Sequence, residues 1–362
     1  MNNIEYNNKT TVLIVSDTHL GASGAKYDDF NNFLNLIYSK KEEGKLELLK
    51  CLIVAGDFFD LCMDSYRDLS KEKINLEIYD NLIKLQDKGI QIVITLGNHE
   101  IPTTWCHDRL FKSRKKTFID EFTKQFNTSG RYLEFFKKIK FCQYCILYTN
   151  NDSKLEINLY DRKKNLAKNK ISKNVVKLDI LSDMDTKQKF LFSHGYQFER
   201  WYLHFFASFV WATSINSPDI IKELNNFLYN DLYKEAEKFS KEQIEEALET
   251  PSTAEFIKTR DIKVEKINRK KLRKLMNKNR KTNLRREKIK DKNKRYFKKA
   301  FKFLEKEKYS HISHVIFGHT HQEDQQQKNN KYVLNAGAWQ NVKHGHYIEI
   351  LVDGKVIPKN YE

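Results

Sequence analysis

Five short apolar runs along the chain each end in a polar turn. They are residues 12–15, 52–55, 92–96, 190–192 and 314–317. Short apolar runs bounded by glycine and polar residues are typical of buried strands. Helical patterns near 28–41 and 71–88 separate the first three runs. Because strands that alternate with helices pair in parallel through right-handed crossovers, the pattern predicts an α/β fold.

Further apolar runs after residue 140 predict a second sheet. The runs that we assign to it are 141–148, 155–160, 175–181, 190–192, 315–317, 332–334 and 347–352. An Asp353-Gly354 turn follows the last run and is typical of a hairpin. Residues 108–138 have a helical pattern instead. Two sheets packed face to face, with helices on the outside, account for all of these elements.

The turns that follow the first five runs carry side chains that bind metal ions. These residues are Asp17, His19, Asp57, Asn98, His194, His319 and His321. An open α/β sheet gathers the ends of its strands at one edge, where ligands bind. Mixed carboxylate and imidazole ligands favour Mn, Fe, Zn or Ni over Mg or Ca. Seven ligands are more than one ion needs.

The order of these motifs resembles that of the calcineurin-like metallophosphoesterase superfamily. D-x-H, G-D-x-x-D, G-N-H-E, H-G and G-H-x-H follow one another over 11–200 and 310–350. Each motif alone is common, but five in the family's order, each after a strand, are specific. The resemblance implies a four-layer αββα sandwich of two mixed sheets with a helical insert before the last motif. The catalytic domain would then cover 1–200 and 310–362, and a helical, strongly basic insert 201–309.

The resemblance also implies a role for each ligand. One metal ion would be held by Asp17, His19, Asp57 and His321, and the other by Asp57, Asn98, His194 and His319, so that Asp57 is the bridge. Two such ions clamp a phosphoryl oxygen and present hydroxide in line with the leaving group. His99 would protonate the leaving oxygen or stabilise its charge. A two-metal phosphoesterase with His99 and Asp57 as catalytic residues is therefore expected, with Mn²⁺ as the first choice and Fe, Zn or Ni as alternatives.

Three positions depart from patterns found in relatives. Glu100 stands where many relatives have Asp after the active-site His. The contact that this side chain makes outside the ligand set can therefore extend over a different distance. Asp60 stands where purple acid phosphatases carry a ligand Tyr, so we expect no Fe(III)-tyrosinate centre. The segments SDTHLG, SHGYQFE and 334–339 are similar to phosphoesterases related to the UDP-2,3-diacylglucosamine hydrolases. Those hydrolases usually have Arg at the position of His99, so their substrate cannot be assigned to this chain.

Three functions remain open at this point. The first is hydrolysis of a phosphodiester or pyrophosphate bond in a nucleotide- or lipid-linked substrate by metal-bound hydroxide. The second is a DNA exonuclease or endonuclease similar to the DNA-repair metallophosphoesterase nucleases, which share S-D-x-H-L-G, G-D-x-F-D and G-N-H. The third is a non-catalytic metal-binding scaffold, which the complete ligand set disfavours.

The N-terminus and the cysteines indicate a cytoplasmic protein. The first residues lack a basic and apolar leader, and no apolar run reaches the roughly 18 residues of a membrane span. The five cysteines form no paired framework. Cys142 and Cys145 lie in an apolar run with no second pair to complete a zinc site, so we expect them to pack in the core. Peripheral association with a membrane is an alternative location.

The predicted insert opens with an aromatic stripe. Aromatic residues recur at 198, 201, 202, 205, 206 and 209, which is the spacing of one helix face. Such a stripe is most often buried against a protein core. Within 198–211 it could instead form an apolar wall for a lipid or a base, or a dimer interface.

The positive charge of the chain lies in one segment of the insert. The formal net charge is +17, and residues 262–302, with 20 Lys or Arg against 3 Asp or Glu, account for all of it. The candidate polyanion-binding residues are Arg269, Arg273, Arg280, Arg285 and Arg286. A field this concentrated attracts nucleic acid or an anionic membrane surface. A solvated helical face without a partner is the third interpretation.

Overall fold

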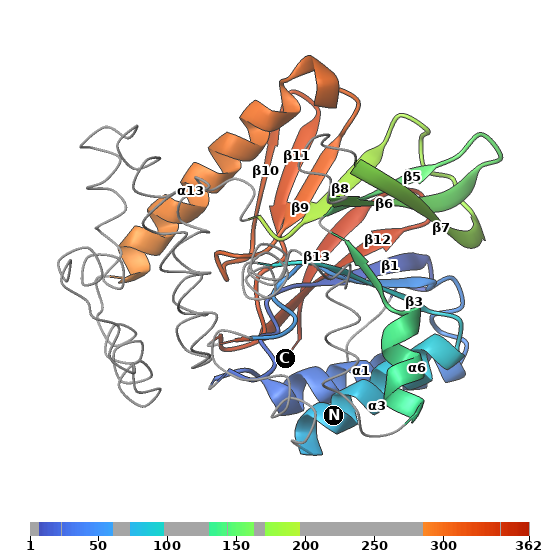
Figure 1. The fold of residues 1–362 in the computed structure, drawn as a ribbon. Coiled ribbons are helices and arrows are strands. Elements are labelled where there is room, and N and C mark those ends of the chain that lie inside the picture. Colours follow the sequence, from blue (N-terminus) through green and yellow to red (C-terminus); the bar gives the residue numbers. More distant parts are fainter. Residues whose placement is uncertain are drawn as a thin grey trace, which may run out of the picture.

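Two mixed β-sheets face each other, and helices cover both outer faces (Figure 1). The structure, a computed structural model, describes residues 7–22, 24–60, 73–97, 130–142, 144–162, 171–195, 285–340 and 342–361 of the 362-residue chain. The layers are helices, first sheet, second sheet and helix. This arrangement confirms the predicted αββα sandwich.

The first sheet has six strands in the order β13-β12-β1-β2-β3-β4. Their bounds are Thr10–Val15 (β1), Cys51–Val54 (β2), Gln91–Thr95 (β3), Lys140–Cys142 (β4), Gly345–Leu351 (β12) and Val356–Tyr361 (β13). The strands β1 to β4 are parallel, whereas β12 and β13 are antiparallel to their neighbours. The carboxyl ends of β1, β2 and β3 therefore meet at one edge of the sheet.

The second sheet has seven strands in the order β10-β11-β9-β8-β5-β6-β7. Their bounds are Tyr144–Thr149 (β5), Lys154–Arg162 (β6), Ile171–Leu181 (β7), Lys189–Ser193 (β8), His314–Phe317 (β9), Asp324–Lys328 (β10) and Lys331–Asn335 (β11). Only β8, β9 and β11 form parallel pairs. The carboxyl ends of β8 and β9 consequently lie side by side.

Apolar side chains alternate between two layers of the core. Leu13 and Val15 of β1 pack toward the helices of the first sheet, whereas Val12 and Ile14 pack toward the second sheet. Successive side chains of a strand point to opposite faces, so a strand buried on both faces appears as a continuous apolar run. The short apolar runs in the sequence are buried for this reason.

Four α-helices lie in the described part of the chain. They are Tyr27–Glu42 (α1), Lys73–Asp87 (α3), Gly130–Lys138 (α6) and Arg285–Leu304 (α13), and a 3-10 helix, Glu307–Tyr309 (η3), follows the last. The first three cover the outer face of the first sheet. On the far side of the sandwich, α13 packs against β8, β9 and β11 (Figure 1). Among the described residues, no helix is both long and apolar enough to cross a bilayer.

Most of the predicted insert, 201–284, lies outside the described residues, and so does the aromatic stripe 198–211. The remainder of the insert contains α13. Tyr296, Phe297, Ala300 and Leu304 of this helix are buried against the second sheet. The division into catalytic domain and insert stays a prediction, but α13 is packed on the catalytic core.

Two sheet assignments from the sequence are wrong. The run 141–148 is not one strand, because β4 pairs with β3 in the first sheet and β5 pairs with β8 in the second. The run 347–352 belongs to the first sheet, where β12 pairs with β1. An apolar pattern shows that a segment is buried but does not identify its partner. The polar strand β10, which is exposed along its length, carried no such pattern.

Candidate metal centre

Six of the seven predicted ligands come together at the carboxyl ends of four strands. They are Asp17 and His19 after β1, Asp57 after β2, His194 after β8, and His319 and His321 after β9. Two of these strands belong to each sheet. The cluster is therefore built across the two sheets at one edge of the sandwich.

The first ligand group consists of Asp17, His19 and His321. The Nε2 atoms of His19 and His321 are 3.2 Å apart. The Oδ1 atom of Asp17 lies 3.6 Å from Nε2 of His19 and 3.2 Å from Nε2 of His321. Asp17 and His19 are buried, whereas the side chain of His321 is 31% exposed. The first ligand group is therefore partly accessible to solvent on the side of His321.

The second ligand group consists of Asp57, His194 and His319. The Oδ2 atom of Asp57 lies 3.2 Å from Nε2 of His194, and this Nε2 lies 2.9 Å from Nδ1 of His319. The same Asp57 oxygen is 3.6 Å from Nε2 of His19 in the first ligand group. Asp57 consequently stands between the two groups.

For two of the histidines, the contact made by Nδ1 determines which ring nitrogen faces the ligand cluster. His194 has Nδ1 3.2 Å from the Ala55 carbonyl oxygen, which can only accept, so Nδ1 carries the proton and Nε2 presents its lone pair. His19 has Nδ1 3.4 Å from Oδ2 of the buried Asp60, which favours the same tautomer. Such contacts orient metal-binding imidazoles and raise their basicity.

Asp17 and His321 of the first ligand group have shifted pKa values. Burial opposes the ionisation of Asp17, but the neighbouring imidazoles of His194, His321 and His19 outweigh this effect and lower its pKa well below 3.8. Burial lowers the pKa of His321, and Asp17 only partly offsets this effect. Near neutral pH the carboxyl is therefore ionised and the imidazole neutral, which are the protonation states that bind cations.

Five of the six residues have a left-handed backbone. The φ angles are 50° at Asp17, 49° at His19, 48° at Asp57, 72° at His319 and 60° at His321. In the described part of the chain only nine non-glycine residues have positive φ. Each such residue costs roughly 1–3 kcal/mol and persists where surrounding contacts hold it, which is common at functional sites.

Two glycines allow the strand ends to approach the carboxylates. A Cβ atom at Gly97 would overlap the carboxylate of Asp57, and one at Gly318 would overlap Ser16 and the carboxylate of Asp17. The main chain must pass this close for the turns to converge. The amide of His319 donates to Oδ2 of Asp17 over 2.8 Å, which ties the β9 turn to the β1 turn.

The donor set fits divalent cations. Two carboxylates and four imidazoles converge, with at least two ring lone pairs directed inward, and Mn, Fe, Zn and Ni bind such a mixture. Oδ1 of Asp17 is buried and accepts no hydrogen bond from the described residues. An unsatisfied buried carboxylate oxygen among imidazole lone pairs is unfavourable unless a cation binds there.

Comparison with known proteins assigns the family. A family model described as calcineurin-like phosphoesterase matches residues 10–323, which is most of the chain. The chain belongs to the calcineurin-like phosphoesterase family. Among solved structures, a dimetal phosphatase from Danio rerio is similar at 8% identity, with 98% of this chain and 99% of that chain covered and a TM-score of 0.32. No curated protein matches the chain significantly.

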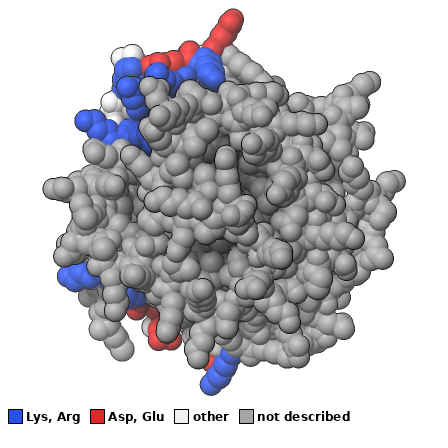
Figure 2. Space-filling model, turned by 60° about the vertical axis from the view of Figure 1, so that its left-hand side comes forward, with Lys and Arg blue, Asp and Glu red and all other residues white. Residues whose placement is uncertain are grey.

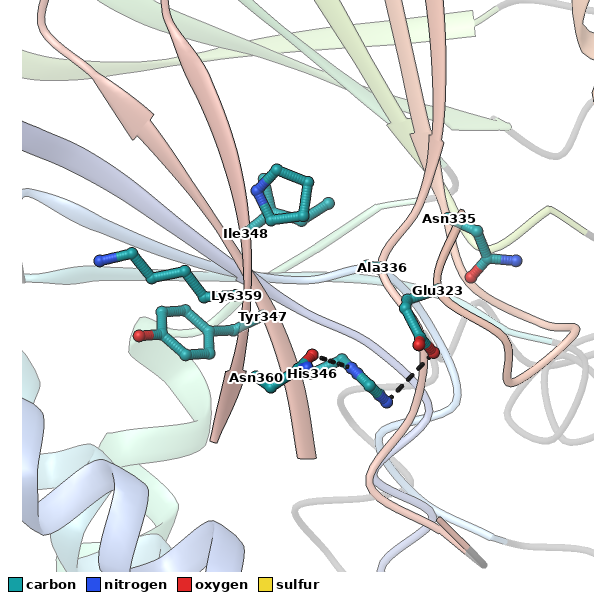
Figure 3. A pocket seen from close by; sticks show the side chains of 9 residues that line it. Glu323, Asn335, Ala336, His346, Tyr347, Ile348, Lys359 and Asn360 are labelled. Carbon is teal, nitrogen blue, oxygen red and sulfur yellow. Dashed lines mark hydrogen bonds and ion pairs between the residues drawn. The ribbon is translucent and has the colours of Figure 1, made fainter. Parts of the chain in front are cut away.

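This calcineurin-like phosphoesterase has a small cavity at the β12–β13 hairpin. It measures about 170 Å³ and lies between the segment after His321 and the β12–β13 hairpin (Figure 3). His346 bridges the two, with Nε2 3.2 Å from the Glu323 carboxylate and Nδ1 2.7 Å from the Asn360 side-chain oxygen. None of the six candidate ligands lines the cavity, so it is separate from the metal centre.

Some predicted site residues lie outside the described residues. They are Asn98, His99, Arg269, Arg273 and Arg280, together with Glu100. Arg285 and Arg286 are the first two residues of α13. The sequence also gave no role to Asn293, which contacts the turn after β9. Asn293 lies in a basic run, and no recognised sequence motif places an Asn at this distance before G-H-x-H.

Proposed function

We propose that the two ligand groups hold two divalent metal ions and that the protein hydrolyses a phosphoester. The observation that carries this proposal is the position of Asp57, whose Oδ2 lies within 3.6 Å of an imidazole nitrogen in each group. A carboxylate between two cations is the arrangement that holds them close together. Bound there, two cations would polarise the phosphoryl group and activate a water molecule.

The protein's own residues prepare the site for this reaction. Asp60 and the Ala55 carbonyl fix His19 and His194 so that each Nε2 points inward. Asp17 supplies a negative charge that persists at low pH. His99 is proposed to protonate the leaving oxygen, as the family pattern implies. Mn²⁺ is the ion that we propose first, with Fe, Zn or Ni as alternatives from the same ligand chemistry.

We propose a phosphodiester or pyrophosphate bond in a nucleotide- or lipid-linked molecule as the substrate. The partly exposed His321 gives the centre an open side through which a substrate can approach. We further propose that the protein works in the cytoplasm, since Cys51, Cys142 and Cys145 are free thiols. The dimer contact through 198–211 stays a prediction.

The decisive experiment measures hydrolysis and metal binding together. Chelator-treated protein would be supplied with Mn²⁺ and tested on an aryl monoester, an aryl diester, a nucleotide-sugar pyrophosphate, a cyclic nucleotide and DNA. Mn²⁺ at about 100 times its dissociation constant should stabilise the fold by about 2.7 kcal/mol per site. Asp57→Asn should lose both the hydrolysis and most of this stabilisation, because each ion loses a ligand.

Asp28→Asn is the matched control, because Asp28 is an exposed carboxylate on α1 away from the ligand groups. It should leave both readouts unchanged. Wild-type protein that gains neither stability nor hydrolysis from Mn²⁺, Fe²⁺, Zn²⁺ or Ni²⁺ would refute the two-metal proposal.

A nuclease is the second candidate function. The described end of the basic run exposes Lys294, Arg295, Lys298 and Lys302 on α13, the helix that also contacts the turn of His319 and His321. Figure 2 views the molecule with the left-hand side of Figure 1 forward, and basic side chains gather at the upper edge with acidic ones beside them. Because basic and acidic side chains lie together on this surface, the nuclease candidate depends mainly on the net positive charge of the whole run 262–302.

A further inference from the structure

The turn between β9 and β10 contributes one imidazole to each ligand group. His319 belongs to the second group and His321 to the first, and only Thr320 separates them. Both histidines have positive φ, and the Thr320 amide donates to the Gly318 carbonyl over 2.9 Å, which closes a tight three-residue turn. A backbone of this kind needs surrounding contacts to hold it.

Those contacts come from a buried network of side-chain amides. Oδ1 of Asn293 on α13 accepts a hydrogen bond from Oγ1 of Thr320 over 2.9 Å. Nδ2 of Asn335 lies 3.3 Å from the same Oδ1, 2.6 Å from Oγ1 of Thr320 and 3.2 Å from the Gly318 carbonyl. Nδ2 of Asn293 donates to Asp324 at the end of the turn over 3.3 Å. Asn293, Thr320 and Asn335 are all buried.

The helix α13 contacts the turn at a second point. Tyr296 is three residues after Asn293, so both lie on one face of α13. Its ring centroid is 5.3 Å from that of His319, and the Tyr296 side chain is 1% exposed. One helix face therefore touches His319 through Tyr296 and Thr320 through Asn293, and the helix itself is fixed to the second sheet.

We propose that Asn293 is a positioning residue for both metal ions. It holds the turn in which His319 and His321 have positive φ, so that one imidazole faces each ligand group. This role rests on the proposed two-metal function. Asn293 touches neither ligand imidazole through its hydrogen bonds, and so it acts through Thr320 and the main chain. The helix α13, which precedes the G-H-x-H motif, consequently supports the geometry of the metal centre.

Metal affinity tests this role without reference to catalysis. In calorimetric titrations of chelator-treated protein with Mn²⁺, Asn293→Ala should weaken binding roughly tenfold or more, the usual effect of losing an outer contact to a metal ligand. Asn81→Ala is the matched control, since Asn81 is also a buried helical Asn and donates to Asn31 over 2.6 Å on the α1–α3 side of the protein. It should lower stability but leave Mn²⁺ affinity unchanged.

Two substitutions at Thr320 keep the test decisive if Asn293→Ala does not fold. Thr320→Val replaces the hydroxyl by a methyl group of similar size and should weaken Mn²⁺ binding about as much as Asn293→Ala does. Thr320→Ser keeps the hydroxyl and should retain the affinity. The double variant of Asn293→Ala and Thr320→Val should lose little beyond the larger single loss, because both remove the same hydrogen bond.

Wild-type Mn²⁺ affinity in both Asn293→Ala and Thr320→Val would overturn the positioning role while leaving the two-metal function intact. If Asn81→Ala weakened Mn²⁺ binding as much as Asn293→Ala, the effect would be general destabilisation, and the role would also fall. Wild-type protein that binds no Mn²⁺, Fe²⁺, Zn²⁺ or Ni²⁺ would overturn this inference and the proposed function together.

Discussion

Asp60 lies against the imidazole of His19, on the side away from the other ligands. Its Oδ2 is 3.4 Å from Nδ1, and both side chains are almost fully buried. Purple acid phosphatases carry a metal-ligating Tyr at this position. In this chain the residue is Asp60, and it contacts the candidate ligand His19. A carboxylate in this place can fix the ring and increase the basicity of Nε2.

Asp60→Asn tests this contact at the scale of one residue. The change keeps the size of the side chain but removes the negative charge that lies 3.4 Å from Nδ1 of His19. We expect Mn²⁺ affinity to fall roughly 10- to 100-fold in calorimetry. Asp29→Asn removes a half-exposed carboxylate on α1 and should have no effect. Equal affinity in wild type and Asp60→Asn would show that the contact does not tune His19.

The strand β9 also carries a histidine that is not one of the candidate metal ligands. His314, at its start, stacks on Phe190 of β8 and Tyr332 of β11, with ring centroids 4.3 and 4.6 Å away. Both neighbours are its register partners in the sheet. Burial, helped by the nearby Lys331 charge, lowers the pKa of His314 to about 4.

This pKa predicts a loss of stability in acid. The unfolded chain takes up a proton near the ordinary pKa of 6.5, whereas the folded protein does so only near 4. The free energy of unfolding should therefore fall as the pH drops from about 6.5 to 4, by roughly 3 kcal/mol at most from this group.

His314→Phe keeps a ring between Phe190 and Tyr332 but removes the titration. Urea unfolding between pH 7 and 4 should show a shallower loss of stability in this variant than in wild type. The Ser313 hydroxyl keeps its bond with Lys189 in the variant, so the strand remains anchored. Parallel pH profiles for the two proteins would mean that His314 is protonated equally in the folded and unfolded chain.

At the scale of the whole molecule, the net charge is concentrated in one part of the chain. Residues 262–302 carry the full +17, so the remainder is neutral. If this run neutralises about six phosphates of duplex DNA, log K should fall with log salt at a slope near −5. Replacement of Arg269, Arg273, Arg280, Arg285 and Arg286 by Gln should flatten the slope, measured by fluorescence anisotropy.

The control for this prediction is hydrolysis of a small nitrophenyl ester, which should persist because no candidate ligand changes. Binding to anionic vesicles but not to DNA would favour a lipid-linked substrate. Binding to neither at physiological salt would mean that the run is a solvated helical face.

The sequence by itself determined the layers of the fold and six of the residues that meet at its edge. Buried parallel strands need apolar side chains on both faces, and their ends are closed by glycine and polar residues, so both leave a local pattern. His19 and His321 are 302 positions apart, yet each was found from its own turn. Local chemistry was sufficient for these features.

The tertiary structure alone decided which segments became neighbours. β12 pairs with β1, about 340 residues away, and nothing local distinguishes that partner from one in the second sheet. The left-handed turn of His319 and His321 depends on Asn293 and Asn335, which come from a helix and a neighbouring strand. Burial and periodicity are encoded over a few residues, whereas strand partners and the contacts that hold a strained turn depend on the packing of the entire chain.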